Sequence, residues 1–285
     1  LLEREVAEIR AITDRPFAVN VIPRFGDAEL VAAIVAARVP VATFFWDEPP
    51  AEWIEQLAAA GTRVWWQVGS VGEARAAVAA GADALVVQGA EAGGHNRSGA
   101  GTMTLVPAVA DAVALPVIAA GGIADGRGLA AVLALGAAGA MLGTRFLMSE
   151  EADAHPGHQA RIAAADVTDT ARHNIFGTDF PDATVRGLRN AIVAEHEGRD
   201  HPEPYAALDQ DTLPIVGTTS IYGQEIALAR FNGLPPVRAT RGDLDQMSLL
   251  AGETVGLIDR VRPVEEIVRE ITRVAEGLLS ERFAA

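Results

Sequence analysis

The feature that most constrains the fold is a repeat of short apolar stretches, each followed by an alanine-rich amphipathic stretch. The starts of the apolar stretches lie mostly 21 to 24 residues apart, and the one longer interval contains the glycine-rich segment 89–101. This alternation is typical of βα units around a parallel sheet. The sequence predicts strands at Phe17–Val21, Val41–Phe45, Arg63–Val68, Ala84–Gln88, Val117–Ala120 and Ala140–Gly143.

Two glycine-containing turns favour one parallel architecture over the other. The repeat length alone fits either an open doubly wound sheet or a (β/α)8 barrel. Gly121 and Gly122 directly follow one predicted strand, and Gly143 and Thr144 follow the next. Turns of this kind expose backbone N–H groups to an anion, and in barrels they are frequent after strands seven and eight. We therefore predict an α/β fold of the TIM (β/α)8 barrel type that lacks its first two βα units, with residues 2–12 as the helix after the absent second strand.

The repeat predicts three regions along the chain. Residues 1–148 carry the βα units and form the predicted barrel, strands three to eight. Residues 149–246 are more polar and rich in proline, and we expect an inserted, mostly helical substrate domain there. Residues 247–285 regain helical periodicity, which predicts C-terminal helices that pack back on the barrel.

Composition excludes several classes of function. The chain has no cysteine, which removes disulfides and thiol nucleophiles, and all 23 of its basic residues other than histidine are arginine, which removes lysine chemistry. A net charge of −15 without a basic stripe argues against nucleic acid as a partner. No apolar run reaches the roughly 20 residues of a membrane span, and no export signal is visible, so we expect a cytoplasmic location and no membrane association.

His95 is the strongest candidate for a catalytic side chain. It follows the predicted strand 84–88 on a loop that contains Gly93 and Gly94. The carboxyl ends of barrel strands form the reaction face, and a histidine there exchanges a proton or donates a hydrogen bond near neutral pH. Arg97 lies two residues further on, where it could neutralise an anionic substrate. His155 and His158, separated by Pro156, are expected to be solvated loop histidines, and we predict no metal site.

Five motifs in this order resemble the nitronate monooxygenase family, formerly called 2-nitropropane dioxygenases. The match extends over nearly the whole chain. The motifs are Pro16-Phe17-Ala18-Val19-Asn20, Gln88-Gly89-Ala90-Glu91-Ala92-Gly93-Gly94-His95, Pro116-Val117-Ile118-Ala119-Ala120-Gly121-Gly122-Ile123, Leu142-Gly143-Thr144-Arg145-Phe146 and Ala251-Gly252-Glu253-Thr254-Val255-Gly256-Leu257-Ile258. The family's first strand, with its Ala-Pro-Met-type motif, and its second strand have no counterpart before Leu1.

The resemblance implies an FMN cofactor and assigns residues to it. It implies that backbone N–H groups and the Thr144 hydroxyl hold the FMN phosphate, and that His95 lies at the substrate, as a base for a neutral nitroalkane or a donor to an anionic nitronate. The implied phosphate residues are Gly121, Gly122, Gly143 and Thr144, and those facing the rest of the flavin are Asn20, Gln67 and Gln88.

The implied reaction is oxidation of an alkyl nitronate, with the flavin reoxidised by O2. The partners are therefore a small nitronate or nitroalkane and O2, with a homo-oligomer as an open possibility. Two alternatives remain at this point. One is a flavin-dependent enoyl-thioester reductase or CoA-ester dehydrogenase that uses NAD(P)H, since related motifs occur there. The other is a non-catalytic or truncated barrel that does not retain FMN.

Overall fold

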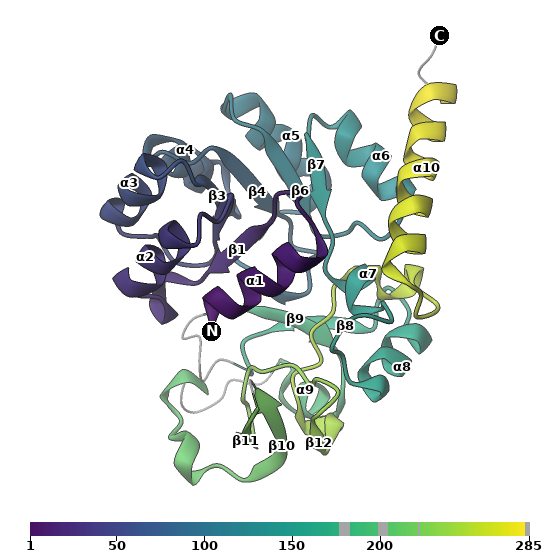
Figure 1. Ribbon diagram of the computed structural model, residues 1–285. Coiled ribbons are helices and arrows are strands. Elements are labelled where there is room, and N and C mark those ends of the chain that lie inside the picture. Colours follow the sequence, from purple (N-terminus) through teal and green to yellow (C-terminus); the bar gives the residue numbers. More distant parts are fainter. Residues whose placement is uncertain (177–182, 199–204, 222, 283–285) are drawn as a thin grey trace.

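The centre of the molecule is a six-stranded parallel sheet in the order β1-β2-β3-β4-β6-β7. The computed structural model describes residues 1–176, 183–198, 205–221 and 223–282. The sheet is curled and flanked by helices, with β1 and β7 at its two edges (Figure 1). Its strands are β1 (Ala18–Val21), β2 (Val41–Phe44), β3 (Arg63–Val68), β4 (Ala84–Gln88), β6 (Val117–Ala120) and β7 (Gly139–Met141).

All six predicted strands are present, and three of them have the predicted bounds. The clearest difference is β7, which ends at Met141, so that Leu142 and Gly143 belong to the following turn. The α/β architecture with helices around a parallel sheet is therefore confirmed, while the six described strands form an open curled sheet rather than a closed eight-stranded ring.

The helices between the strands cover the sheet and end where the sequence indicates. Gly61, Gly81 and Gly136 follow the ends of three helices with φ values of 78°, 99° and 96°, a conformation that favours glycine. The helices of this part are α1 (Leu2–Ile12), α2 (Ala28–Ala36), α3 (Ala51–Ala59), α4 (Val71–Ala79), α5 (Thr102–Ala112), α6 (Gly126–Ala134) and α7 (Thr144–Leu147).

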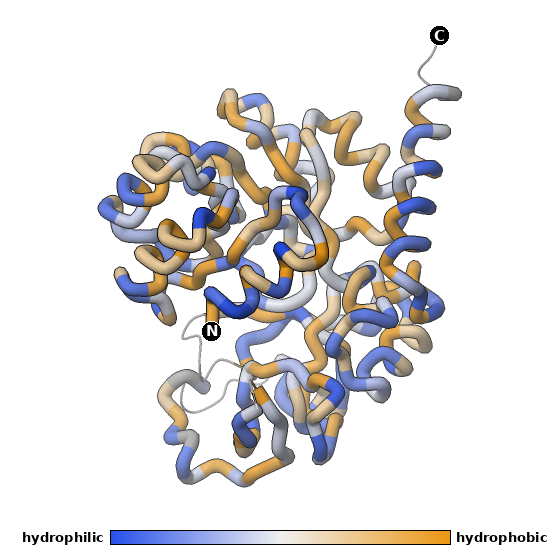
Figure 2. Tube along the Cα trace, in the orientation of Figure 1, coloured by the Kyte–Doolittle hydropathy of each residue, from blue (hydrophilic) through white to orange (hydrophobic). Residues whose placement is uncertain are grey.

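The largest apolar core lies between the sheet and its helices. Its fully buried members include Phe44 of β2, Leu57 of α3 and Leu85 of β4. Figure 2 shows the central strands as mostly hydrophobic, as expected for a parallel sheet covered by helices. Among the described residues, no helix is both long enough and apolar enough to cross a membrane.

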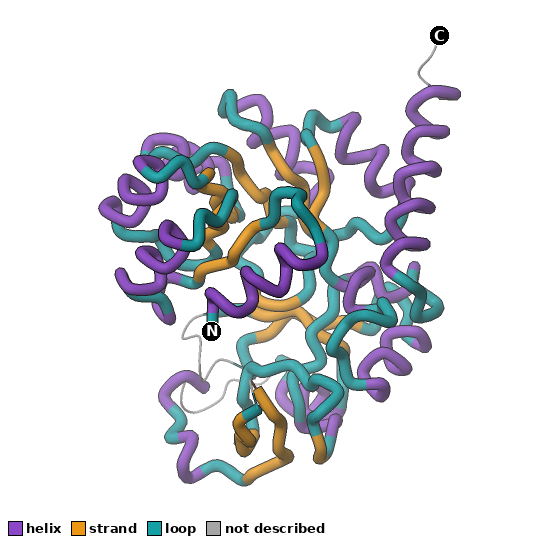
Figure 3. Tube along the Cα trace, in the orientation of Figure 1, coloured by secondary structure: helices purple, strands orange, loops and turns teal. Residues whose placement is uncertain are grey.

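The prediction of a mostly helical insertion at residues 149–246 is wrong. Among its described residues, five short strands have about the same total length as its two α-helices and short 3-10 helices (Figure 3). The segment Ile215-Val216-Gly217-Thr218-Thr219 of β10 contains four β-branched residues, which favour a strand. The elements are α8 (Pro156–Ala164), β8 (Thr170–His173), β9 (Val185–Leu188), α9 (Ala191–His196), β10 (Ile215–Ile221), β11 (Gln224–Ala229) and β12 (Arg241–Gly242).

Two small antiparallel sheets organise this insertion. One has the order β11-β10-β12. The other has the order β5-β9-β8, where β5 is Gly94–His95 from the loop after β4. The second sheet therefore joins the insertion to the loop on which His95 lies.

The C-terminal helix α10 (Val264–Arg282) packs against α6. A Cβ at Gly126 would lie 2.5 Å from the Ile271 carbonyl oxygen, so the two helices approach closely at this glycine. Figure 1 shows α10 running beside α6 along one side of the sheet.

His158 is buried, and its prediction as a solvated loop histidine is wrong. It lies in α8 with a fully buried side chain, and no described residue forms a hydrogen bond with either ring nitrogen. His155 instead caps α8, because its Nδ1 accepts a hydrogen bond of 3.0 Å from the Gly157 amide. Burial, with smaller contributions from His155 and Arg161, lowers the pKa of His158 to about 4.

We expect this buried histidine to make the fold sensitive to acid. The unfolded chain binds a proton near pH 6.5 and the folded chain only near pH 4, so stability is lost as the pH falls from about 6.5 to about 4. The loss reaches about 1.4 kcal/mol per pH unit for this group within that window. Urea unfolding of wild type and His158→Leu at pH 7, 6 and 5 measures it.

His158→Leu should lower the slope of the pH dependence, whereas the control His155→Asn, which keeps a capping side chain, should retain the full slope. Equal slopes for wild type and His158→Leu would contradict the assignment of this acid sensitivity to His158.

Candidate functional site

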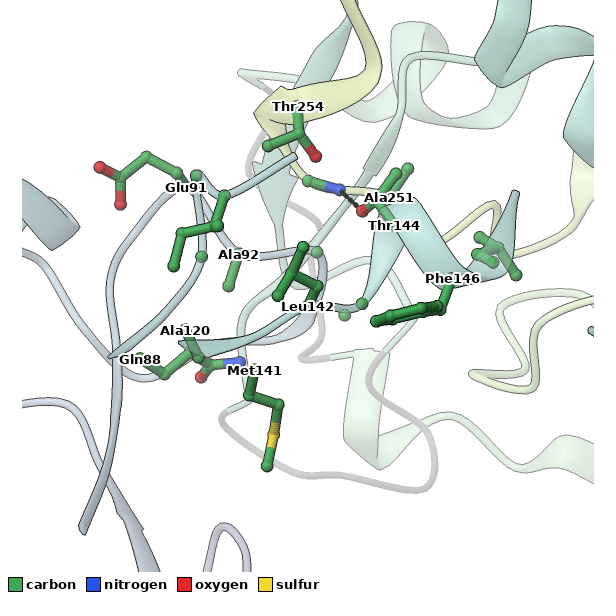
Figure 4. A pocket seen from close by; sticks show the side chains of 18 of the residues that line it. Gln88, Glu91, Ala92, Ala120, Met141, Leu142, Thr144, Phe146, Ala251 and Thr254 are labelled. Carbon is green, nitrogen blue, oxygen red and sulfur yellow. Dashed lines mark hydrogen bonds between the residues drawn. The ribbon is translucent and has the colours of Figure 1, made fainter. Parts of the chain in front are cut away.

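A cavity of about 510 Å³ opens at the carboxyl ends of β3, β4, β6 and β7. The loop after β4, the turns after β6 and β7, and a segment near residue 251 form its walls (Figure 4). The ends of parallel strands are the usual place for a ligand in such folds. Of the residues assigned to FMN from the sequence, six line this cavity: Gln67, Gln88, Gly121, Gly122, Gly143 and Thr144.

The two glycine turns present unused backbone donors. Gly121 and Gly122 have φ values of 95° and 72°, and a Cβ at Gly121 would lie 3.0 Å from the Ala92 amide nitrogen. In the part of the chain that the structure describes, the amides of Gly121, Gly122, Gly143 and Thr144 donate to no protein acceptor. Four free N–H groups on one cavity suit a phosphate, because each can donate to a phosphate oxygen.

Thr144 connects the second turn to the C-terminal part of the chain. Its Oγ1 accepts a hydrogen bond of 2.9 Å from the Gly252 amide, drawn as a dashed line in Figure 4. Since the hydroxyl oxygen accepts this bond, its proton is left to donate to a ligand. The residues after the insertion therefore complete the wall that the two turns begin.

Glu91 and Thr102 support the first glycine turn from behind, a role that sequence reasoning missed. The Glu91 carboxylate accepts from the Thr102 amide at 2.9 Å and lies 3.0 Å from the Thr102 hydroxyl. The same hydroxyl lies 2.9 Å from the Gly121 carbonyl oxygen. Glu91 thus caps α5, whose own N-cap residue is Gly101. Gly101 before Thr102 was the only signal for this helix start, and nothing local pointed to Glu91 as its cap.

The glutamines and Asn20 occupy strand ends with different surroundings. Gln88 Nε2 donates to the His95 carbonyl oxygen at 3.3 Å, which ties the cavity wall to the His95 loop. Asn20 lies on β1 outside the cavity lining, and its Oδ1 accepts a bond of 3.0 Å from the Thr43 hydroxyl. The role of Asn20 toward the flavin therefore stays a prediction.

His95 adjoins the cavity rather than lining it. Gly94 is part of the cavity wall, and the His95 ring turns toward Trp46, with 5.8 Å between ring centroids and a 73° interplanar angle. Its Nε2 is buried. β5, which holds His95, pairs with β9 of the insertion, with His95 opposite Val185.

Arg97 lies two residues after His95 on the loop that follows β4. Its Nη1 donates to the Trp46 carbonyl oxygen, and its Nη2 lies 3.1 Å from Glu73 Oε1. Its predicted contact with substrate remains a prediction, and the described ion pair neutralises part of its charge.

His173 is a second histidine near His95 that sequence reasoning overlooked, and both of its ring nitrogens are buried. It lies opposite Val185 on β8, and Val185 lies opposite His95, so both histidines project from the same face of this small sheet. Neither of its ring nitrogens has a hydrogen-bond partner among the described residues. Burial, with a smaller effect of Arg186, lowers its pKa to about 4, which leaves it neutral at neutral pH. Only the strand register reveals this proximity.

Comparison with known proteins identifies the family. The sequence model of the family described as nitronate monooxygenase matches residues 23–273. A probable nitronate monooxygenase of Bacillus subtilis is 30% identical over 316 residues, which cover 95% of this chain and 84% of that protein.

Two other relatives widen the range of chemistry. The (3aS,4S,5R,7aS)-5-hydroxy-7a-methyl-1-oxo-octahydro-1H-indene-4-carboxyl-CoA dehydrogenase of Rhodococcus jostii is 32% identical over 283 residues, covering 94% of this chain and 80% of that protein. The structure of FabK from Thermotoga maritima superposes with a TM-score of 0.78 at 31% identity, covering 99% of this chain and 83% of that one.

We expect Thr102→Val to weaken FMN more than riboflavin, because it removes the hydroxyl beside the Gly121 carbonyl without changing the side-chain shape. One hydrogen bond is worth about 1 kcal/mol, so the dissociation constant for FMN should rise about fivefold. Quenching of flavin fluorescence measures both ligands.

The control is Thr104→Val, which removes a hydroxyl from the same helix that donates to the Gly101 carbonyl oxygen. It should leave the ratio of the two affinities at the wild-type value. An equal loss for FMN and riboflavin in Thr102→Val would show that the residue does not act on the phosphate turn.

Proposed function

Because this chain belongs to the nitronate monooxygenase family, we propose that it oxidises alkyl nitronates with O2, with FMN held at the carboxyl end of the sheet. The family establishes the coarser part of this statement, an FMN-dependent oxidoreductase. The nitronate as substrate is the part that we propose.

One observation supports the proposal most directly. Gly121, Gly122, Gly143 and Thr144, whose amides donate to no described acceptor, line the cavity whose wall continues into the loop of His95. The phosphate end of FMN would bind these amides, and Gln67 and Gln88 on neighbouring strand ends would face the rest of the flavin. When bound, FMN supplies a two-electron acceptor that O2 can reoxidise.

His95 would accept a proton from the substrate or donate a hydrogen bond to it, depending on the charge of the substrate. With a neutral nitroalkane, the imidazole would accept the proton from the carbon that bears the nitro group. With an anionic nitronate, it would donate a hydrogen bond to a nitronate oxygen. The chain carries a net charge of −15, which repels an anion at long range, so local donors such as His95 have to provide its recognition.

The dehydrogenase of Rhodococcus jostii supports a second candidate, because it is as similar to this chain as the nitronate monooxygenases are. In that case the substrate would be a CoA ester, and NAD(P)H would take the place of O2 as the partner of the flavin. The proposed reaction with a nitronate therefore has to be compared directly with reduction of the flavin by NADH.

We expect the purified protein to be yellow and to consume O2 when propionate 3-nitronate is added, without rapid flavin reduction by NADH. An oxygen electrode and stopped-flow absorbance provide the two measurements. Rapid reduction by NADH with no response to the nitronate would instead favour the reductase or dehydrogenase. A colourless protein that fails to retain added FMN would contradict both enzymes.

His95→Gln should retain the flavin spectrum and lose about 100-fold or more in turnover, the range expected for a general acid or base. The matched control His155→Asn changes a histidine that caps α8 outside the cavity and should keep wild-type turnover. Loss of flavin colour in His95→Gln would reassign His95 to cofactor retention.

A further inference from the structure

Trp46 has a backbone conformation that is unfavourable for its side chain. It follows β2 at the carboxyl end of the sheet with a φ of 76°, in the left-handed region. Large side chains rarely adopt this conformation, and such strain tends to persist where the surroundings enforce it, often at functional sites. The side chain is 9% exposed and contacts Ile22, Phe45 and Ala183.

Arg97, on the loop that follows β4, contacts Trp46 in this conformation. Its Nη1 donates to the Trp46 carbonyl oxygen, and its guanidinium carbon lies 5.6 Å from the centroid of the Trp46 ring. Glu73 holds the arginine in turn, with Oε1 at 3.1 Å from Nη2. Glu73 Oε2 also accepts from the Gly69 amide at 2.8 Å, which anchors the carboxylate to the end of β3. The planar fork of arginine makes these contacts together.

The Trp46 ring then meets His95. The two rings are 5.8 Å apart at a 73° angle, an edge-on contact that restricts rotation of the imidazole. The main chain of His95 is held separately by Gln88 and by pairing with Val185. Trp46 therefore packs against the His95 ring, and Arg97 contacts both the carbonyl oxygen and the ring of Trp46.

We propose that Trp46 is a positioning residue for His95 and that Arg97 acts through Trp46, by fixing its strained backbone, instead of by binding substrate. The inference rests on the proposed role of His95 in turnover. It differs from direct substrate binding in its kinetic consequence. Loss of an arginine that binds an anionic substrate raises KM, whereas misorientation of His95 lowers kcat.

The test compares Arg97→Lys, Trp46→Leu and the milder Trp46→Phe as FMN-loaded enzymes, with propionate 3-nitronate as substrate. Lysine keeps the positive charge and loses the fork and the stacking. We expect kcat to fall about tenfold in Arg97→Lys and Trp46→Leu and less in Trp46→Phe, with KM within twofold of wild type and unchanged flavin content. A tenfold rise in KM at unchanged kcat in Arg97→Lys would overturn the proposal.

Arg161→Lys is the matched control. Arg161 makes an ion pair with Asp245 through both of its terminal nitrogens, and it lies outside the cavity. It should keep wild-type kcat and KM. A similar fall in kcat in this variant would mean that loss of any such arginine slows the enzyme, which would overturn the specific role of Arg97.

A second measurement does not depend on the substrate. In the 15N-labelled, FMN-loaded protein, the imidazole signals of His95 are assigned by their loss in His95→Gln. They should shift, with an altered pH titration, in Trp46→Leu, Trp46→Phe and Arg97→Lys but not in Arg161→Lys. Unchanged His95 signals in the three variants would overturn the proposal. Absence of nitronate turnover in wild type would defeat the proposed function and leave this measurement valid.

Discussion

The site depends on a close backbone contact between the loop after β4 and the segment that follows the insertion. A Cβ at Gly93 would lie 2.4 Å from the Ala251 carbonyl carbon, and one at Gly252 would lie 2.7 Å from the Glu91 carbonyl oxygen. The Glu253 amide donates to that same oxygen at 3.0 Å. Side chains at either glycine would separate the two segments. Because Gly252 also donates to Thr144, this contact sets the width of the cavity between the two turns.

An acidic residue also lies in the wall of the predicted phosphate site. Glu91 lies in the cavity wall, and Figure 4 shows its carboxylate directed away from Thr144. Its oxygens accept from Thr102 at the start of α5, where the helix dipole favours negative charge. The carboxylate is thereby used to hold the Gly121 turn, and the anion site relies on main-chain amides.

The insertion contributes to the site through strand pairing and not through a separate helical cover. β9 pairs with β5, so residues 90 positions apart in the chain, His95 and Val185, lie side by side. His173 joins them across β9. Pairing of this kind depends on register, which a sequence of short polar strands specifies weakly. The insertion was therefore the part of the chain where the expectation of secondary structure was wrong.

The sequence by itself determined the βα repeat, the helix ends at glycine and the two glycine turns that line the cavity, since each follows from local hydrophobic period or from the backbone freedom of glycine. Only the tertiary structure decided that Glu91 supports the Gly121 turn, that Trp46 lies between Arg97 and His95, and that the ring nitrogens of His158 and His173 are buried. These contacts join segments far apart in the chain, and their partners depend on how strand ends converge. No local pattern of residue types encodes that convergence.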